Sequence, residues 1–291
     1  MDFGKLENIT DVNFALPSED KFYFKNKGRN HLDILLGATG WSMTKWKGNI
    51  YPPKSKTEDF AKLYSDQFAT IEFNTTYYQV PPEALMERWY NNTTPDFVFC
   101  PKMFVGISQS SNIGMGSSLL PDFLQRMTMF KEKLGLIFMQ MPQSFSTKKM
   151  DNLVKFIQAW RPGIPLSIEL RHESFFEPSV AEDVAELMAK SGINWMITDV
   201  AGRREVSHGR ITAPFMGVRF VGNDDESDLE RIDDWIERLL NWQKNGVEVL
   251  YFFIHTPQNL TPHRLCDYFA EKWMEKTGRK LKVPVVEKGL F

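Results

Sequence analysis

One short segment in the middle of the chain alternates apolar and ionisable side chains in a way that could carry chemistry. Ile168 and Leu170 have one parity. Ser167, Glu169 and Arg171 have the other. A strand with opposite charges on one face cannot bury both of its faces in an apolar core. The segment therefore predicts a strand whose charged face lines a polar site.

The same polar parity recurs near the carboxyl ends of the other expected strands. The inward-facing polar residues predicted in this way are Glu72, Asn74, Lys102, Gln140, Glu169, Arg171, Asp199, Arg219 and His255. Buried charges must be paired or must bind something. A salt-bridge network without chemistry is one explanation of the set, but desolvating so many charges only to fill space is costly. A cavity for a polar, anionic ligand is therefore the favoured interpretation.

Two kinds of catalysis suit these residue types. Glu72 and Glu169 are the expected pair for general acid–base chemistry, which needs two groups with separated pKa values. Lys102 could instead be an amine nucleophile that forms a Schiff base, if Arg171 lowers its pKa. The residues alone do not choose between these mechanisms. The predicted catalytic residues are Glu72, Glu169, Lys102 and Asp199.

Aromatic residues after the first two expected strands could add a stacking wall for a sugar or a base. They are Trp41, Trp46, Tyr51, Tyr77 and Tyr78. For Trp46 and Tyr51, the favoured alternative is that they anchor their loop to the core. The predicted substrate-binding residues are Trp41, Asn74, Tyr77, Gln140, Arg171, Arg219 and His255.

A divalent metal is a less favoured alternative. The oxygen-rich set that would suit magnesium or manganese is Glu72, Glu169, Asp199 and His255. The neighbouring cations would neutralise these carboxylates equally well, and the sequence contains no HExxH motif. It also contains no P-loop, GxGxxG motif or nucleophile elbow, so no organic cofactor is indicated.

Eight expected strands must position these residues. They span 33–37, 70–75, 97–102, 134–141, 165–172, 194–200, 215–222 and 247–255. Predicted helices at 57–67, 82–91, 121–133, 148–160, 177–190, 228–244 and 262–276 separate most of them. Residues 201–214 have no helical period, so the helix between strands six and seven is expected to be missing or irregular. The pattern predicts an α/β fold: residues 1–31 as an extension, and residues 32–291 as a single TIM-type (β/α)8 barrel with its site at the carboxyl ends of the strands.

The composition limits the classes of function. A net charge of -2 over 291 residues gives no global field that attracts nucleic acid. Two cysteines, no long apolar run and no signal-peptide pattern predict a cytoplasmic protein without a membrane span. The basic loop 203–210, together with the cluster 21–29, keeps nucleic-acid binding as an alternative.

Several motifs resemble the YecE-like family, domain of unknown function 72. They are Gly37-Ala-Thr-Gly-Trp41, Trp46-Lys-Gly, Tyr51-Pro, the block 68–78, Trp89 with the block 94–97, Phe99 with Lys102, Gln140-Met-Pro142, Glu169-Leu-Arg-His172, Asp199 and the block 218–222. The resemblance implies a TIM-type barrel with a polar pocket at its C-terminal face, and it implies no established reaction. The segments 107–110 and 254–263 depart from the family pattern, which predicts a changed specificity or a weakened site if they touch substrate.

Three functions follow as expectations. The favoured one is a barrel enzyme that acts on a small anionic or sugar-like substrate through its carboxylates. The alternatives are a protein that binds or processes nucleic acid or nucleotides, and a non-catalytic ligand sensor.

Overall fold

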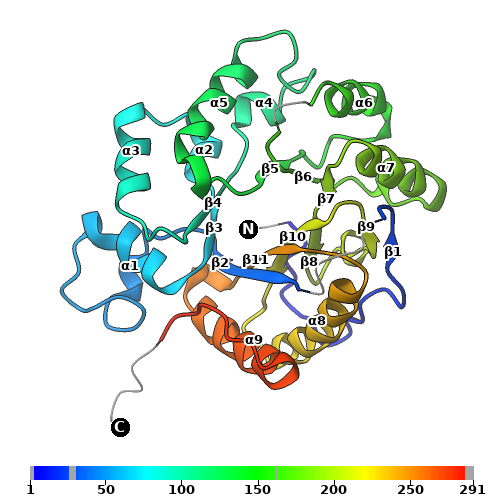
Figure 1. Cartoon of the computed structure of the whole chain (residues 1–291). Helices are drawn as coiled ribbons and strands as arrows, with labels where there is room; N and C mark the ends of the chain where they lie inside the picture. Colours follow the sequence, from blue (N-terminus) through cyan, green and yellow to red (C-terminus); the bar gives the residue numbers. More distant parts are fainter. Residues whose placement is uncertain (1–2, 26–30, 161–162, 286–291) are drawn as a thin grey trace.

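Mostly parallel strands form the centre of the computed structural model, which describes residues 3–25, 31–160 and 163–285 (Figure 1). The largest sheet has the strand order β4-β3-β2-β11-β10-β8. Its strands are β2 (Asp33–Ala38), β3 (Thr70–Phe73), β4 (Val98–Pro101), β8 (Ile197–Asp199), β10 (Phe215–Val221) and β11 (Val249–His255). A three-stranded sheet joins β5 (Ile137–Gln140), β6 (Leu166–Glu169) and β7 (Asn194–Trp195). In a third sheet, β1 (Lys21–Phe22) pairs with β9 (Arg210–Ile211).

The two larger sheets adjoin each other at two places. β7 and β8 are successive parts of one segment, separated by Met196; β7 pairs with β6 and β8 pairs with β10. On the other side, single parallel bridges link Phe99 to Leu134 and Lys102 to Phe138. In the part of the chain that the structure describes, the hydrogen-bonded ladders do not form one closed sheet. The α/β class is therefore observed, while the closure predicted from the sequence is not.

Helices lie around the outside of the strands (Figure 1). The α-helices are α1 (Phe60–Gln67), α2 (Thr75–Tyr78), α3 (Glu83–Asn91), α4 (Val105–Ser108), α5 (Leu119–Met127), α6 (Met150–Ala159), α7 (Pro178–Lys190), α8 (Ser227–Lys244) and α9 (Pro262–Thr277). The 3-10 turns are η1 (Thr44–Trp46), η2 (Thr57–Asp59), η3 (Thr128–Lys133), η4 (Thr147–Lys149), η5 (Glu173–Phe175), η6 (Arg204–Val206) and η7 (Pro257–Asn259). Between β8 and β10 the chain forms only η6 and β9, in agreement with the irregular segment predicted there.

Alternation along the strands divides the apolar side chains into two layers. A small cluster on the inner side of the strands contains Cys100, Leu136, Phe138, Met196, Tyr251 and Phe253. The large cluster lies between the strands and the helices and includes residues of opposite parity, such as Ile71, Phe220 and Phe252. The polar residues that share the inner parity therefore emerge at the carboxyl ends of the strands, just beyond the small cluster.

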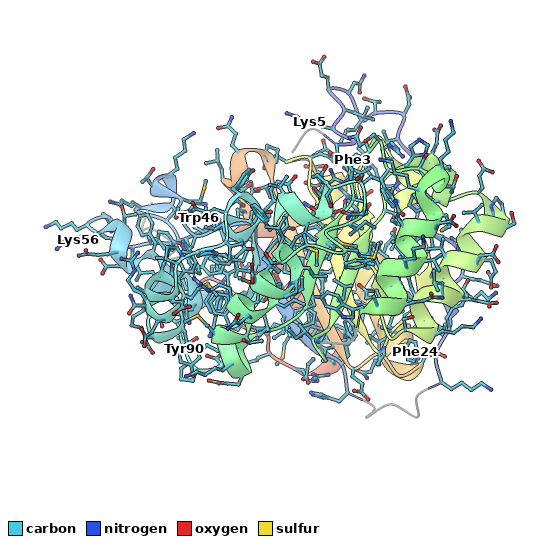
Figure 2. The ribbon with its side chains drawn as sticks, turned by 90° about the horizontal axis from the view of Figure 1, so that it is seen from above. Phe3, Lys5, Phe24, Trp46, Lys56 and Tyr90 are labelled. Carbon is cyan, nitrogen blue, oxygen red and sulfur yellow. The ribbon has the colours of Figure 1, made fainter. Side chains whose placement is uncertain are left out.

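The N-terminal extension packs along the fold at several points. Phe3 is buried against Val200 and Val206, and the Lys21–Phe22 strand pairs with β9. Figure 2 places Phe3 and Lys5 at one end of the molecule and Phe24 near the opposite end. Part of the basic cluster predicted at 21–29 lies outside the described residues.

Within the described ranges, no helix is both long and apolar enough to cross a membrane.

Candidate functional site

Arg219 on β10 is the centre of the buried polar cluster. Its side chain is 2% exposed and contacts two carboxylates that are each 1% exposed. Nε and Nη2 donate to the two Glu72 oxygens at 2.9 and 3.1 Å. Nη1 donates to the two Glu169 oxygens at 3.2 and 3.0 Å. One guanidinium thus joins β3, β6 and β10 across the inner side of the strands.

Glu169 also begins a chain of hydrogen bonds that leads to a lysine. Arg171 Nε donates to Glu169 Oε1 at 2.9 Å, and Gln140 Nε2 donates to Glu169 Oε2 at 2.7 Å. Lys102 Nζ in turn donates to Gln140 Oε1 at 2.9 Å. The chain of contacts fixes the orientation of the Gln140 amide, because its nitrogen must face the carboxylate and its oxygen the ammonium.

Glu72 has two further partners. His255 Nε2, at the end of β11, lies 2.8 Å from Glu72 Oε2. Asn74 Nδ2 donates to Glu72 Oε1 at 3.1 Å and to the backbone oxygen of Thr39 at 3.2 Å. Both carboxylates are therefore held by several donors, a pattern that favours their ionised forms.

The pKa values follow from this arrangement. Burial alone would raise the pKa of Glu72, but the charge of Arg219 and the hydrogen bond with His255 hold that pKa well below its usual range. Burial also opposes ionisation of Glu169, and Arg171 and Arg219 overcome it and lower the pKa of Glu169 to about 2. Both groups stay anionic at neutral pH.

The pKa values of the two basic groups are also lowered, which in their case favours the neutral form. Burial, followed by repulsion from Arg219, lowers the pKa of Lys102 to about 8, although Glu72 and Glu169 oppose the shift. Burial likewise lowers the pKa of His255, against the attraction of Glu72. Within this cluster, Lys102 is therefore the group that loses its proton just above neutral pH.

Aromatic rings support the cations. Lys102 Nζ lies 4.3 Å from the ring centre of Tyr77, which is partly buried at the end of α2. Phe138 on β5 lies beneath both Lys102 and Arg219, at 5.5 and 5.2 Å. Phe138 shares the parity of Gln140, so strand alternation was a signal that could have identified it from the sequence.

Asp199 does not join this cluster. It is buried on the outer side of β8, where its side chain pairs with Arg204 and Arg231 and accepts a hydrogen bond from Trp235 Nε1 at 2.8 Å. In the β10–β8 register, Thr198 is the residue beside Arg219. The prediction that Asp199 faces inward was wrong, because along this strand Asp199 shares its parity with outward-facing Ile197.

Trp41 also lies away from the cluster. Its ring packs against Phe73, Trp89 and Phe99 in the layer between strands and helices, at centroid distances of 5.0, 6.0 and 6.0 Å. It is a core residue in this position and does not form the predicted stacking wall. Trp46 anchors its loop, as the alternative interpretation held, because its Nε1 donates to the backbone oxygen of Asn259 at 2.8 Å.

The polar cluster has neighbours that the sequence did not indicate. The ring of Phe3 lies 4.3 Å from the Arg171 guanidinium carbon, and Arg203 Nη2 donates to the Arg171 backbone oxygen at 2.7 Å. A cavity of about 310 Å³ reaches His255 and is bounded by the N-terminal segment on one side. The N-terminal segment has no periodicity that would have predicted these contacts.

The carboxylates that were considered for a metal do not form one set. Asp199 is separated from the others by its position on the outer side of β8. Across residues 3–25, 31–160 and 163–285, no three histidine, cysteine, aspartate or glutamate side chains are grouped so that they could hold a metal ion.

Comparisons with known proteins agree on one family. The model of the family "Protein of unknown function DUF72" matches residues 35–287. UPF0759 protein YecE of Escherichia coli O157:H7 is 27% identical over 244 residues, which cover 77% of this chain and 86% of the relative. UPF0759 protein YunF of Bacillus subtilis is 26% identical over 242 residues, with 78% and 80% covered.

Solved structures show the same fold. A DUF72 family protein of Enterococcus faecalis aligns with a TM-score of 0.65 at 20% identity, covering 85% of this chain and 96% of the other. A DUF72 family protein of Thermotoga maritima aligns with a TM-score of 0.64 at 21% identity, covering 85% and 100%.

Proposed function

The chain belongs to the DUF72 family of proteins of unknown function, and from the site itself we propose that it is an enzyme that binds a small anionic substrate at the cluster around Arg219. A buried lysine with a neutral partner carries this proposal. Lys102 is 8% exposed, and its Nζ donates to the amide oxygen of Gln140. The carboxylates of the cluster, Glu72 and Glu169, bind arginines instead.

Among the described residues, no carboxylate forms an ion pair with Lys102. Burial lowers the pKa of His255, so this side chain adds no positive charge to the cluster at neutral pH. Lys102 donates to a neutral amide, while both carboxylates are engaged with arginines. A buried ammonium that is hydrogen-bonded to a neutral group is unfavourable, and a bound anion would offset its charge.

The proposed chemistry assigns proton transfer to Lys102 and His255. General acid–base catalysis works best when the pKa lies near the operating pH. A carboxyl group with a pKa of about 2, as in Glu169, is a poor proton donor at neutral pH. We therefore assign Glu72 and Glu169 to holding Arg219 and to stabilising positive charge, a different role from the acid–base pair expected from the sequence.

Lys102 also suits covalent catalysis. A lysine with a pKa of about 8 is unprotonated in about a tenth of the molecules at pH 7. Its amine can then condense with a carbonyl group to form a Schiff base and release water. The same lowered pKa serves either role, so the substrate class is an anion that carries a carbonyl group or a transferable proton.

Three finer expectations belong to this proposal. The eight strands would form a TIM-type barrel, supported by the single bridges at Phe99 and Lys102 that lie between the two larger sheets. The site would then lie at the C-terminal face of that barrel. A cytoplasmic location is supported by Cys100 and Cys266, which are free thiols.

The basic loop gives little support to the nucleic-acid alternative. Arg203 pairs with Glu205, and Arg204 pairs with Asp199, so both guanidiniums already have carboxylate partners within the chain. Cationic side chains bind nucleic-acid phosphates by neutralising them and releasing the small counterions condensed on the nucleic acid. The loop therefore presents less basic surface than its sequence indicates.

Sulfate binding tests the proposal, because sulfate keeps its charge between pH 6 and pH 9. We expect calorimetry to detect sulfate binding to the wild type that weakens as the pH rises through about 8, where Lys102 loses its proton. Lys102→Met should weaken binding and remove this pH dependence. Lys133→Met is the matched control, because Lys133 is buried elsewhere and donates to the backbone oxygen of Thr93 at 2.9 Å.

A second measurement addresses the reaction. Incubation with pyruvate and borohydride should attach the reduced adduct to Lys102 in the wild type, identified by peptide mass spectrometry. Sulfate binding that is equal in wild type and Lys102→Met would refute the proposed site. Binding without any adduct or turnover of anionic carbonyl compounds would favour the non-catalytic sensor over the enzyme.

A further inference from the structure

The N-terminal segment 3–9 lies directly on the polar cluster. Phe3 is 4% exposed, and its ring centre is 4.3 Å from the guanidinium carbon of Arg171 and 5.0 Å from that of Arg203. A ring over a guanidinium is attracted to it and excludes water from one of its faces. Phe3 thus limits the positions open to Arg171, which also binds Glu169.

Two glycines let this segment approach the fold closely. The Gly202 amide donates to the Gly4 backbone oxygen at 2.8 Å. A Cβ at Gly202 would lie 2.9 Å from that oxygen and 3.1 Å from the Leu6 side chain. Because the first of these neighbours is a backbone atom, a side chain at position 202 would push the segment outward.

The same segment bounds the cavity beside His255. Lys5, Leu6, Glu7 and Ile9 line one side of this cavity of about 310 Å³. The lining on the other side comes from residues 221–225, at the end of β10, and from residues 255–258, at the end of β11. Its volume is at the lower end of the range for small-molecule sites.

The charges around the cavity differ from those of the polar cluster. Glu7, Asp224 and Asp225 line it, with Lys5 as the cation. A second anionic group would be repelled there, whereas hydroxyl groups could bind the carboxylates and the His255 ring. The cavity therefore favours the uncharged, polar part of a ligand.

We propose that segment 3–9 is a wall of the substrate-binding site, in which Phe3 is a positioning residue for Arg171. The substrate would place a single anionic group between Lys102 and Arg171 and extend a hydroxylated, uncharged part into the cavity beside His255. The inference rests on the proposed function, and it assigns a role to a segment outside the range 35–287 that the family model matches.

Substitution of Phe3 in the full chain tests the positioning role. We expect Phe3→Ala to weaken sulfate binding about five-fold, the size expected from losing one ring–guanidinium contact. Phe3→Tyr, which keeps the ring, should restore the affinity. Phe14→Ala is the matched control, because Phe14 lies 5.3 and 4.7 Å from Arg204 and Arg231 in the separate Asp199 cluster.

Arginine labelling gives a readout that does not depend on a ligand. Phenylglyoxal should modify Arg171 faster in Phe3→Ala and in Gly202→Ala than in the wild type, as measured by peptide mass spectrometry. Gly40→Ala is the control for the glycine change, because a Cβ at Gly40 meets no atom within 4 Å. Unchanged labelling of Arg171 in both variants would overturn the positioning role.

The ligand length provides the last test. Glycerol 3-phosphate should bind more tightly than sulfate in the wild type, and Gly202→Ala should reduce this advantage. If the wild type binds neither anion, the proposed function fails and the inference fails with it. If the wild type binds both anions and the variants bind them equally well, the proposed anion site is supported and only the proposed role of segment 3–9 is refuted.

Discussion

Removal of the Arg219 guanidinium is the sharpest perturbation of the buried cluster. In Arg219→Met, Glu72 and Glu169 remain at 1% exposure but lose four hydrogen bonds to the guanidinium. Removing one partner of a buried ion pair destabilises a protein by about 3–5 kcal/mol. We expect a loss of this size in the free energy of unfolding at pH 7.

The pH dependence of that loss can be derived from Glu169. Its pKa falls from the usual 4.5 to about 2 in the folded protein. Such a shift contributes about 3 kcal/mol of stability, which is fully present above pH 4.5 and is lost as the pH falls toward 2. In Arg219→Met part of this shift disappears while the larger effect of Arg171 remains, so the stability gap to the wild type should narrow by about 1 kcal/mol between pH 5 and pH 3.

Urea unfolding at both pH values measures these quantities. Arg126→Met is the control for loss of an arginine, because Arg126 pairs at 3.2 Å with Glu83, whose side chain is 73% exposed. Exposed pairs of this kind contribute about 1 kcal/mol or less. A gap for Arg219→Met that stays constant from pH 7 to pH 3 would refute the argument that ionised, buried carboxylates cause the instability.

Three further predictions concern other parts of the fold. Asp199→Asn should lower the melting temperature, because it weakens the ion pairs with Arg204 and Arg231, and should leave the affinity for sulfate unchanged. A change in that affinity would show that Asp199 takes part in binding. Burial lowers the pKa of His208 from 6.5 to about 3, so stability should fall as the pH drops from 6.5 toward 3, and His208→Gln should flatten that part of a melting-temperature profile. Gly37→Ala should cost about 1–3 kcal/mol in urea unfolding, because its Cβ would lie 2.2 Å from the Thr70 backbone oxygen.

The strand pattern was predictable because side-chain parity is a local property of extended chain. Glu72, Arg219 and His255 could be assigned to one face from alternation within their own segments, and the structure brings their side chains into contact. The longer helices followed in the same way from their periodicity, with boundaries that moved by a few residues, whereas the short helices α2 and α4 were not predicted. The rule was applied wrongly to Asp199, which was predicted to face inward but shares the parity of outward-facing Ile197.

The partners of each side chain were not predictable in this way. Arg219 and Glu72 are 147 residues apart in the chain, and Phe3 reaches Arg171 from outside the regular pattern altogether. Trp41 could have faced either the site or the helices, because the loop that carries it has no period. Packing against Phe73 and Trp89 decided its direction.

The sequence by itself determined which ionisable groups lie at the carboxyl ends of the strands, because alternation and the order of strands and helices depend on residues that are close together in the chain. Only the tertiary structure decided their protonation. The pKa of Glu169 falls to about 2 and that of Lys102 to about 8 because burial and the charges of distant strands act on them together. These effects depend on distances between residues far apart in the chain, so they changed the proposed chemistry from paired carboxylates to a lysine.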